Sequence, residues 1–169
     1  CGFGRLGADF GSIHYDMKPD LITVAKGLTS AYQPLSGVIV GEKVWNVLEN
    51  GTDQWGAIGH GYTYSGHPIA CAVALTNMEI FEKEGILEHV RNIAPYFKSS
   101  LESLKDIPIV KDVRTAGIIG AVECELTGVS NEELGKLIDK HCVDMGLIVR
   151  PIDNICVMSP PLIITREQI

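Results

Sequence analysis

Apolar residues recur at helical spacing in the middle of the chain and again toward its end. Between Ile86 and Leu104 an apolar residue stands at every third or fourth position, which predicts an amphipathic helix. A second stripe follows Ser130, which forms a capping box with Glu133 and so marks a helix start. The stretch His67–Glu84 is also predicted to be helical. The two stripes are Ile86, Val90, Ile93, Phe97, Leu101 and Leu104, and then Leu134, Leu137, Ile138, Cys142 and Met145.

Short apolar runs predict strands in the remaining segments. Leu21–Ala25 is a continuous β-prone run, so we predict a strand buried on both faces, as in a parallel sheet. Glu42–Leu48 is predicted to be a short helix, and Asn50–Gly61 a loop. Thr165 and Gln168 form another capping box that opens a helix at the chain end. The further predicted strands lie in Leu35–Val40, Val110–Glu125, Leu147–Ile152 and Ile155–Met158.

The alternation of strands and helices predicts an α/β fold in two parts. After Pro108 the helical spacing of apolar residues gives way to strand-like segments. Before it, two predicted helices separated by Gly85 connect the two parts. We therefore expect residues 1–84 to be the end of a larger parallel-sheet domain and residues 85–169 a smaller α/β domain. Because the first residue is Cys1 rather than Met, and the last predicted helix is cut off, we expect both parts to belong to a longer protein.

Composition narrows the classes of partner. The chain is 46% hydrophobic and 21% charged, which is ordinary for a globular protein. Its formal net charge of −7 argues against binding to nucleic acid or to an anionic membrane. The five cysteines include no C-x-x-C pair, so we expect no disulfide framework, no metal site and a reducing, cytoplasmic location. Neither a transmembrane run nor a signal peptide is predicted.

Lys26 is the first residue that could carry chemistry. It follows the apolar run Leu21–Ala25 and precedes Gly27, so it is predicted at the carboxyl end of a strand, where open α/β sheets bind ligands. An apolar wall would favour the neutral amine, which is a nucleophile for aldehydes. The alternative is a lysine that extends from a strand end into solvent. Position alone leaves both readings open.

Two further segments could bind anions. The loop from Gly59 to Pro68 combines hydroxyls, glycines and a helix start, which suits a phosphate, although an ordinary N-capped loop would look the same. Arg150 stands between apolar residues and Pro151, and its planar guanidinium matches a carboxylate. An ion pair with one of the 21 acidic residues is the alternative for Arg150. His60 and His67 are given no catalytic role.

Taken in order, four motifs resemble the class III aminotransferases, most of all their ω-amino acid and amine:pyruvate branch. The motifs are CGFGRLG at Cys1–Gly7, PDLITVAKG at Pro19–Gly27, GYTYSGHP at Gly61–Pro68 and GLIVRP at Gly146–Pro151. The resemblance spans essentially the whole chain. It implies the fold of the type I pyridoxal-phosphate-dependent transferases, with the C-terminal part of the large cofactor-binding domain followed by the small domain.

The same resemblance implies roles for three residues. Lys26 would form the internal aldimine with pyridoxal 5′-phosphate and carry the proton during transfer. Thr63 would hydrogen-bond the cofactor phosphate of the neighbouring subunit in a homodimer with shared sites. Arg150 would bind a substrate carboxylate and swing away for uncharged amines. Ala31 stands where many relatives have glycine, which we interpret as variation within the branch.

The implied reaction moves an amino group from an amine or ω-amino acid to a keto acid, with pyruvate expected. The family's aspartate for the pyridine nitrogen, its phosphate loop and its stacking aromatic lie upstream of Cys1, so we expect the 169-residue chain alone to be inactive. The sequence leaves open an aminomutase or decarboxylase on the same fold, and a non-catalytic dimerising fragment. It specifies neither the donor nor the choice between pyruvate and 2-oxoglutarate.

Overall fold

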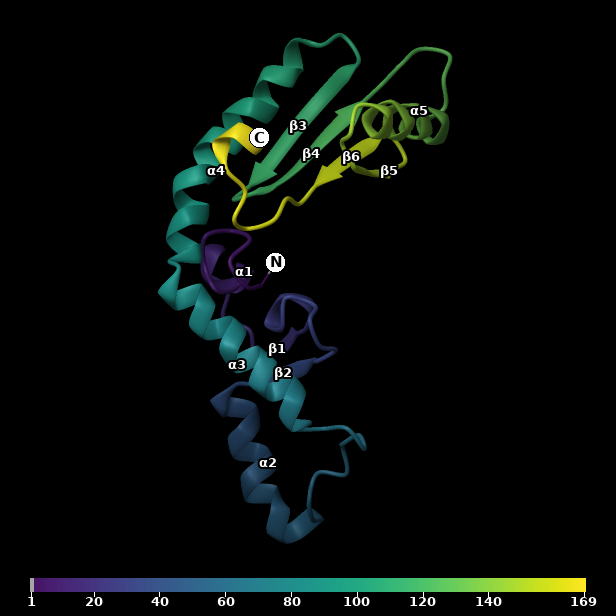
Figure 1. Ribbon diagram of the computed structural model, residues 1–169. Coiled ribbons are helices and arrows are strands. Elements are labelled where there is room, and N and C mark those ends of the chain that lie inside the picture. The colour runs from purple at the N-terminus through teal and green to yellow at the C-terminus, as the bar shows by residue number, and fades with distance from the viewer. Residues whose placement is uncertain (1) are drawn as a thin grey trace. The chain divides into compact units, whose positions relative to one another are not determined.

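The structure is a computed structural model, and it describes residues 2–169. Cys1, the first of the five cysteines and the first residue of the CGFGRLG motif, lies outside the described residues. The chain is mixed α/β and divides into two compact units, whose elements Figure 1 labels. Unit 1 contains the chain up to Phe3 and then Ala8–Gly85. Unit 2 contains Gly4–Gly7 and Ile86–Ile169.

Unit 1 contains a two-stranded sheet that is antiparallel. Leu21 pairs with Val40 and Val24 with Gly37. The prediction of a parallel strand buried on both faces is therefore wrong for the described residues, since every side chain of β1 is exposed or half-buried. In chain order unit 1 holds α1 (Gly11–His14), β1 (Leu21–Val24), the 3₁₀ turn η1 (Lys26–Leu28), β2 (Gly37–Val40), α2 (Glu42–Trp55) and α3 (Pro68–Lys83).

The reversal between β1 and β2 depends on residues with positive φ. Lys26, Ser30 and Ala31 have φ angles of 52°, 48° and 64°. Residues with a Cβ rarely adopt this left-handed region, and the residue types of the segment did not predict the positive φ angles. The three residues lie in the segment that connects β1 to β2 and returns the chain for antiparallel pairing.

Two helices complete unit 1. α2 runs to Trp55, seven residues beyond the predicted end at Leu48, so the prediction of a loop from Asn50 is wrong for its first part. Thr52 Oγ1 donates to Leu48 O at 3.0 Å inside this extension. α3 begins at Pro68, in the first turn as predicted, where a missing N–H costs no intrahelical bond.

Unit 2 is a four-stranded antiparallel sheet with helices packed on it. The strand order is β3-β4-β6-β5, separate from the sheet of unit 1. The predicted strand from Leu147 begins only at Arg150. Its elements are α4 (Ile86–Glu102), the turn η2 (Ser103–Asp106), β3 (Val110–Ala116), β4 (Ile119–Cys124), α5 (Asn131–Asp144), β5 (Arg150–Ile152), β6 (Ile155–Met158) and the turn η3 (Arg166–Gln168).

The one large cluster of buried apolar residues found among residues 2–169 lies in unit 2. Val90 and Ile118 are fully buried. The predicted stripe of α4 forms one side of this core, and β3, β4, β6 and α5 contribute the rest. The buried members are Val90, Ile93, Phe97, Leu101, Val113, Ile118, Val122, Cys124, Leu134 and Cys156.

Both predicted capping boxes are present in unit 2. Ser130 Oγ accepts from Glu133 N, and the Glu133 carboxylate accepts from Ser130 N, each at 3.3 Å. Thr165 and Gln168 form the second box, but the element that follows is only the short turn η3.

The loop Gly4–Gly7 belongs to unit 2, which the predicted boundary at residue 84 did not include. Ile118 N donates to Arg5 O at 3.1 Å, and Arg91 Nη1 donates to Gly7 O at 2.8 Å. The Arg5 guanidinium donates to Pro160 O, and burial lowers the pKa of Arg5. Gly117 has φ of 56°, and a Cβ there would lie 2.4 Å from Arg5 O, so this close approach requires glycine.

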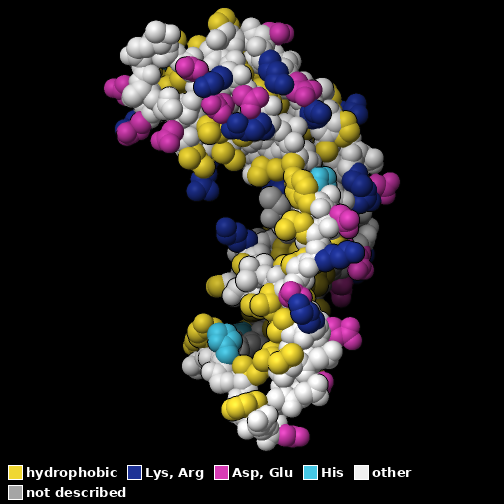
Figure 2. Space-filling view, turned by 180° about the vertical axis from the view of Figure 1, so that it is seen from behind, with side chains coloured by type: hydrophobic (Ala, Val, Ile, Leu, Met, Phe, Trp, Pro, Cys, Tyr) yellow, Lys and Arg dark blue, Asp and Glu magenta, His cyan; other side chains and the backbone are white. Residues whose placement is uncertain are grey.

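Charges of both signs share the surface. Figure 2 shows basic and acidic side chains intermixed on the face that it draws. On unit 2, Lys111 pairs with Glu123 and Glu125, and Arg114 pairs with Asp112 and Glu123. Within the part of the chain that the structure describes, no helix is both long and apolar enough to cross a membrane.

Candidate active site

Lys26 lies one residue beyond the end of β1, as the first residue of the turn η1. It is exposed, so the predicted apolar wall around the amine is not formed by the described residues. Among residues 2–169 its Nζ takes part in no ion pair. The amine is therefore accessible to a ligand.

The backbone at Lys26 is held in an unfavourable conformation. A lysine with φ of 52° costs conformational energy, and such outliers persist only where surrounding contacts fix them. Some of these contacts are hydrogen bonds within the turn itself. Leu28 N donates to Ala25 O, and Ala31 N donates to Lys26 O at 3.3 Å. Thr29 is 1% exposed, and its Oγ1 donates to Gln33 O at 2.5 Å.

Gly27 gives the turn room against a neighbouring ring. A Cβ on Gly27 would lie 2.9 Å from Phe3 Cβ, closer than real Cβ atoms approach. Phe3 in turn packs edge-on against Phe10, with ring centroids 5.7 Å apart. The residue after Lys26 is thus glycine because an aromatic side chain of the same unit lies directly over it.

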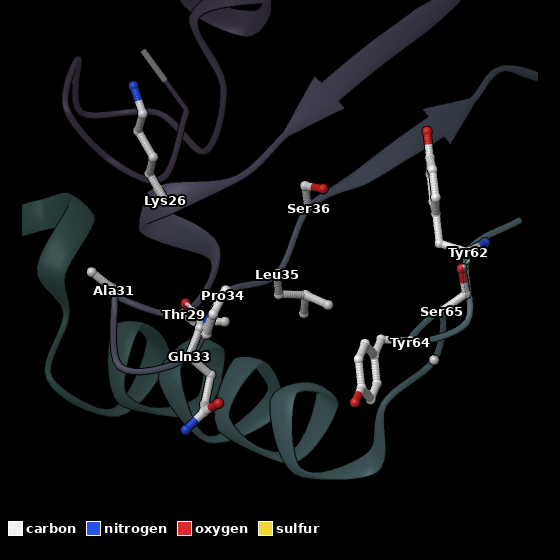
Figure 3. A pocket seen from close by; sticks show the side chains of 11 residues that line it. Lys26, Thr29, Ala31, Gln33, Pro34, Leu35, Ser36, Tyr62, Tyr64 and Ser65 are labelled. Carbon is white, nitrogen blue, oxygen red and sulfur yellow. Dashed lines mark hydrogen bonds between the residues drawn. The ribbon is translucent and has the colours of Figure 1, made fainter.

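A surface cavity of about 670 Å³ adjoins Lys26, and all of its lining belongs to unit 1. Figure 3 shows the segment between β1 and β2 on one side of it and the loop before α3 on the other. The lining offers one amine and several hydroxyls, and its size is typical of a small-molecule site. The lining residues are Lys26, Thr29, Ala31, Gln33, Pro34, Leu35, Ser36, Tyr62, Tyr64, Ser65 and Gly66.

The loop before α3 is a tight turn whose hydroxyls stay exposed. Ser65 N donates to Tyr62 O at 2.9 Å, and Ser65 Oγ accepts from Tyr62 N at 3.0 Å. Tyr62 and Tyr64 are 76% and 79% exposed. Thr63 lies in the same turn and is exposed, but the cavity is lined by its neighbours rather than by Thr63 itself.

Arg150 is the first residue of β5, in unit 2, where it pairs with Val157 across the sheet. Its side chain is exposed. None of the ion pairs formed among residues 2–169 includes Arg150, so the alternative of an ordinary ion pair is not observed there. Its guanidinium is available to an anionic ligand.

The cysteines in the described part of the chain form no disulfide with one another. Cys71, Cys124, Cys142 and Cys156 are free thiols. Burial raises the pKa of the Cys156 thiol to about 11, so it is protonated at neutral pH and packs as an apolar residue. No group of three potential metal ligands was found among residues 2–169.

Asn77 is a residue of this region that sequence analysis missed. It lies on α3, and its side chain hydrogen-bonds to the turn that carries Lys26. The available signal was a single amide within the apolar stretch of α3, since asparagine is a poor residue for a helix interior.

Comparison of the sequence with models of protein families identifies the family. The model described as aminotransferase class-III matches residues 1–169, the entire chain. This chain belongs to the class III aminotransferases.

Relatives support the same assignment. The chain is 46% identical to the diaminobutyrate–2-oxoglutarate transaminase of Halomonas elongata and 42% identical to the putrescine–pyruvate aminotransferase of Pseudomonas aeruginosa. In both cases 100% of this chain is aligned with 38% of the relative. The chain therefore spans less than half the length of these curated relatives.

Solved structures match the fold closely. A transaminase from a directed-evolution study based on ancestral reconstruction gives a TM-score of 0.94 at 47% identity, over 99% of this chain and 39% of that one. The aminotransferase of Vibrio fluvialis in its PMP-bound form gives 0.92 at 35% identity, over 99% and 38%.

Pyridoxal phosphate is the cofactor of this family, and the residues of the cavity fit it. An aldehyde needs a primary amine, which Lys26 offers at the cavity. A phosphate needs hydroxyl and N–H donors near a helix start, which the exposed turn Tyr62–Gly66 before α3 offers to a cofactor of this chain or of a second copy. The described residues thus include both kinds of group that the cofactor needs.

Proposed function

We propose that the whole protein is a pyridoxal-phosphate-dependent aminotransferase that moves an amino group from an amine or ω-amino acid to a keto acid. The observation that carries the proposal is Lys26, an accessible amine on a strained turn beside a hydroxyl-lined cavity. Pyruvate is our proposed acceptor. The named relatives use putrescine with pyruvate and diaminobutyrate with 2-oxoglutarate, so both acceptors belong in any assay.

Each proposed role follows from the chemistry of the side chain. When bound, the cofactor supplies the electron sink for the substrate carbon. Lys26 Nζ holds the cofactor and afterwards, as a free amine, accepts a proton from the substrate and returns it. Arg150 binds a donor or acceptor carboxylate through its two parallel N–H groups.

We further propose that the protein is a homodimer with shared sites, in which Thr63 donates to the cofactor phosphate of the neighbouring subunit. Its exposure, and the cavity lining formed by its neighbours instead, support a partner on the outer side of this turn. Exposed aromatic residues nearby, Trp55, Tyr62 and Tyr64, are the kind of surface that interfaces cover.

The division of the chain supports a proposal for its domains. Unit 1 would be the C-terminal part of the large cofactor-binding domain, and unit 2 the small C-terminal domain. The free thiols of the described cysteines support a reducing, cytoplasmic location. The names of some relatives place those proteins in mitochondria or chloroplasts, so fractionation of the host cell is the test.

Replacement of Lys26 tests the proposed function. In the full-length protein, Lys26→Ala should abolish amino transfer to pyruvate and to 2-oxoglutarate. Borohydride should fix pyridoxal phosphate to Lys26 of the unmodified protein, as mass spectrometry of peptides would show. Lys18→Ala, at another exposed lysine of unit 1, is the control and should leave both results unchanged. Full transfer activity in Lys26→Ala would refute the proposal.

A further inference from the structure

Three side-chain hydrogen bonds join Asn77 of α3 to the turn that carries Lys26. Asn77 Nδ2 donates to Gly27 O at 2.9 Å and to Leu28 O at 3.2 Å. Its Oδ1 accepts from Ser30 Oγ at 2.7 Å. A carboxamide provides two donors and an acceptor together, so Asn77 satisfies all three groups with one side chain.

These bonds act on the strained part of the backbone. All three partners lie within four residues after Lys26, and both Lys26 and Ser30 have positive φ. The other hydrogen bonds of the turn are local, between residues of the segment itself. Asn77 is 47 to 50 residues away in sequence, so it ties the turn to a long helix of the same unit. A long helix is a rigid support, whereas a short turn alone would sample other conformations.

We propose that Asn77 is a positioning residue for Lys26. It fixes the left-handed turn and thereby the direction in which the Lys26 side chain extends from the backbone. The inference rests on the proposed function, because it concerns the lysine that would hold the cofactor. Asn77 is absent from the cavity lining, so it acts through the turn and not by contact with a ligand.

Three substitutions separate the contributions of the amide. Asn77→Asp keeps the volume and the acceptor for Ser30, but it replaces both donated bonds with repulsion between oxygens. Asn77→Ala removes all three bonds, and Ser30→Ala removes one. Thr76→Ala, at the adjacent exposed position of α3, is the matched control.

The measurements are made on the full-length protein. The first is the pyridoxal phosphate concentration that gives half-maximal borohydride-fixed labelling of Lys26. We expect it to rise about tenfold in Asn77→Asp and Asn77→Ala, about threefold in Ser30→Ala and not at all in the control. The second is hydrogen exchange at the amides of Leu28 and Thr29 without cofactor, which should become faster in the same order. Thermal unfolding reports any general loss of stability.

The outcomes distinguish the inference from the function on which it rests. Absence of label on Lys26 in the unmodified protein would overturn both. A labelled Lys26 with unchanged half-saturation and unchanged amide exchange in Asn77→Asp would overturn only the role of Asn77, even if thermal unfolding shifts. A higher half-saturating concentration that follows faster amide exchange across the variants, with Thr76→Ala unaffected, would establish it.

Discussion

At the scale of single residues, each unit holds one candidate side chain that ordinary protein contacts leave unused. The Lys26 amine and the Arg150 guanidinium belong to different units, and neither forms an ion pair among residues 2–169. Lys111 and Arg114 of unit 2, by contrast, do pair with carboxylates. Lys26 lines the cavity and Arg150 begins β5, so these two are the cations to test with carbonyl and anionic ligands.

Arg150→Ala should separate substrates by charge. A charge-assisted hydrogen bond contributes about 1.5–3 kcal/mol, so kcat/KM for donors that carry a carboxylate should fall by roughly 10- to 150-fold. Simple amines such as putrescine should lose far less. Steady-state kinetics of the full-length protein with 4-aminobutyrate and putrescine measures the difference. Arg166→Ala, at an arginine that lies over the Tyr96 ring, is the control. Equal losses for both donors would remove Arg150 from the substrate role.

Residue identity indicated Lys26 but not its surroundings. The apolar run and the following glycine singled out the lysine, and the resemblance supplied a role. The positive φ of Lys26 was not predictable, because lysine ordinarily avoids that region and only the fixed turn imposes it. Asn77 was missed because its partners are two backbone carbonyls and the hydroxyl of a serine 47 residues away, and the sequence does not show that these groups meet.

At the scale of elements, periodicity succeeded where one face is buried and failed where it is not. The stripe from Val90 to Leu101 was predicted and forms the core side of α4. α2 buries no residue among those described, and Asn50 with Gly51 suggested a loop where the helix in fact continues to Trp55. The direction of β2 relative to β1 could not be read from apolar runs, because pairing is decided by the turn between them.

Gly51 of α2 and Gly135 of α5 should respond to alanine in opposite directions. Gly51→Ala should raise stability by up to about 1 kcal/mol, because alanine favours helix and the nearest atom, on exposed Trp55, can move. At Gly135 a Cβ would lie 1.8 Å from Asp153 O, so Gly135→Ala should cost about 1–3 kcal/mol or more by overpacking. Thermal unfolding of both variants checks this. A stabilised Gly135→Ala would contradict the close packing of α5 on the β5–β6 turn.

The capping box of α5 should make stability depend on pH. Hydrogen bonds from Ser130 lower the pKa of Glu133 below its ordinary 4.5. A carboxyl whose pKa is lowered by folding stabilises the fold above 4.5, and the contribution is lost as the pH falls further. Ser130→Ala should therefore lower the free energy of unfolding at neutral pH by about 1 kcal/mol, the usual cost of losing an N-cap. The difference from the unmodified protein should shrink in acid, whereas exposed Ser159→Ala should show no difference at either pH.

At the scale of the whole molecule, shared sites make a prediction about mixed dimers. Thr63→Ala should raise the pyridoxal phosphate requirement about tenfold, since it removes a hydrogen bond to a charged group. A dimer of one Lys26→Ala subunit and one Thr63→Ala subunit would contain one site with both changes and one with neither. Its intact site should saturate at the cofactor concentration of the unmodified protein.

Borohydride labelling of purified mixed dimers measures this saturation. If Thr63 served the site of its own subunit, every Lys26 in the mixed dimer would meet an altered Thr63, and saturation would stay shifted. That result would exclude the shared arrangement. Mixed dimers of one Lys26→Ala subunit and one unmodified subunit contain a single Lys26. Their labelling is the reference for saturation of one site in each dimer.

The path of the chain through unit 2 has a consequence for cutting it. The loop Gly4–Gly7 is separated from Ile86 by all of unit 1 in sequence, yet Ile118 and Arg91 donate hydrogen bonds to it. Cleavage after Gly85 would not yield two pieces that each fold alone. The loop Gly4–Gly7, which is part of unit 2, would remain on the N-terminal piece. The two pieces would instead form a complementing pair, in which an N-terminal peptide completes a fold encoded mostly elsewhere.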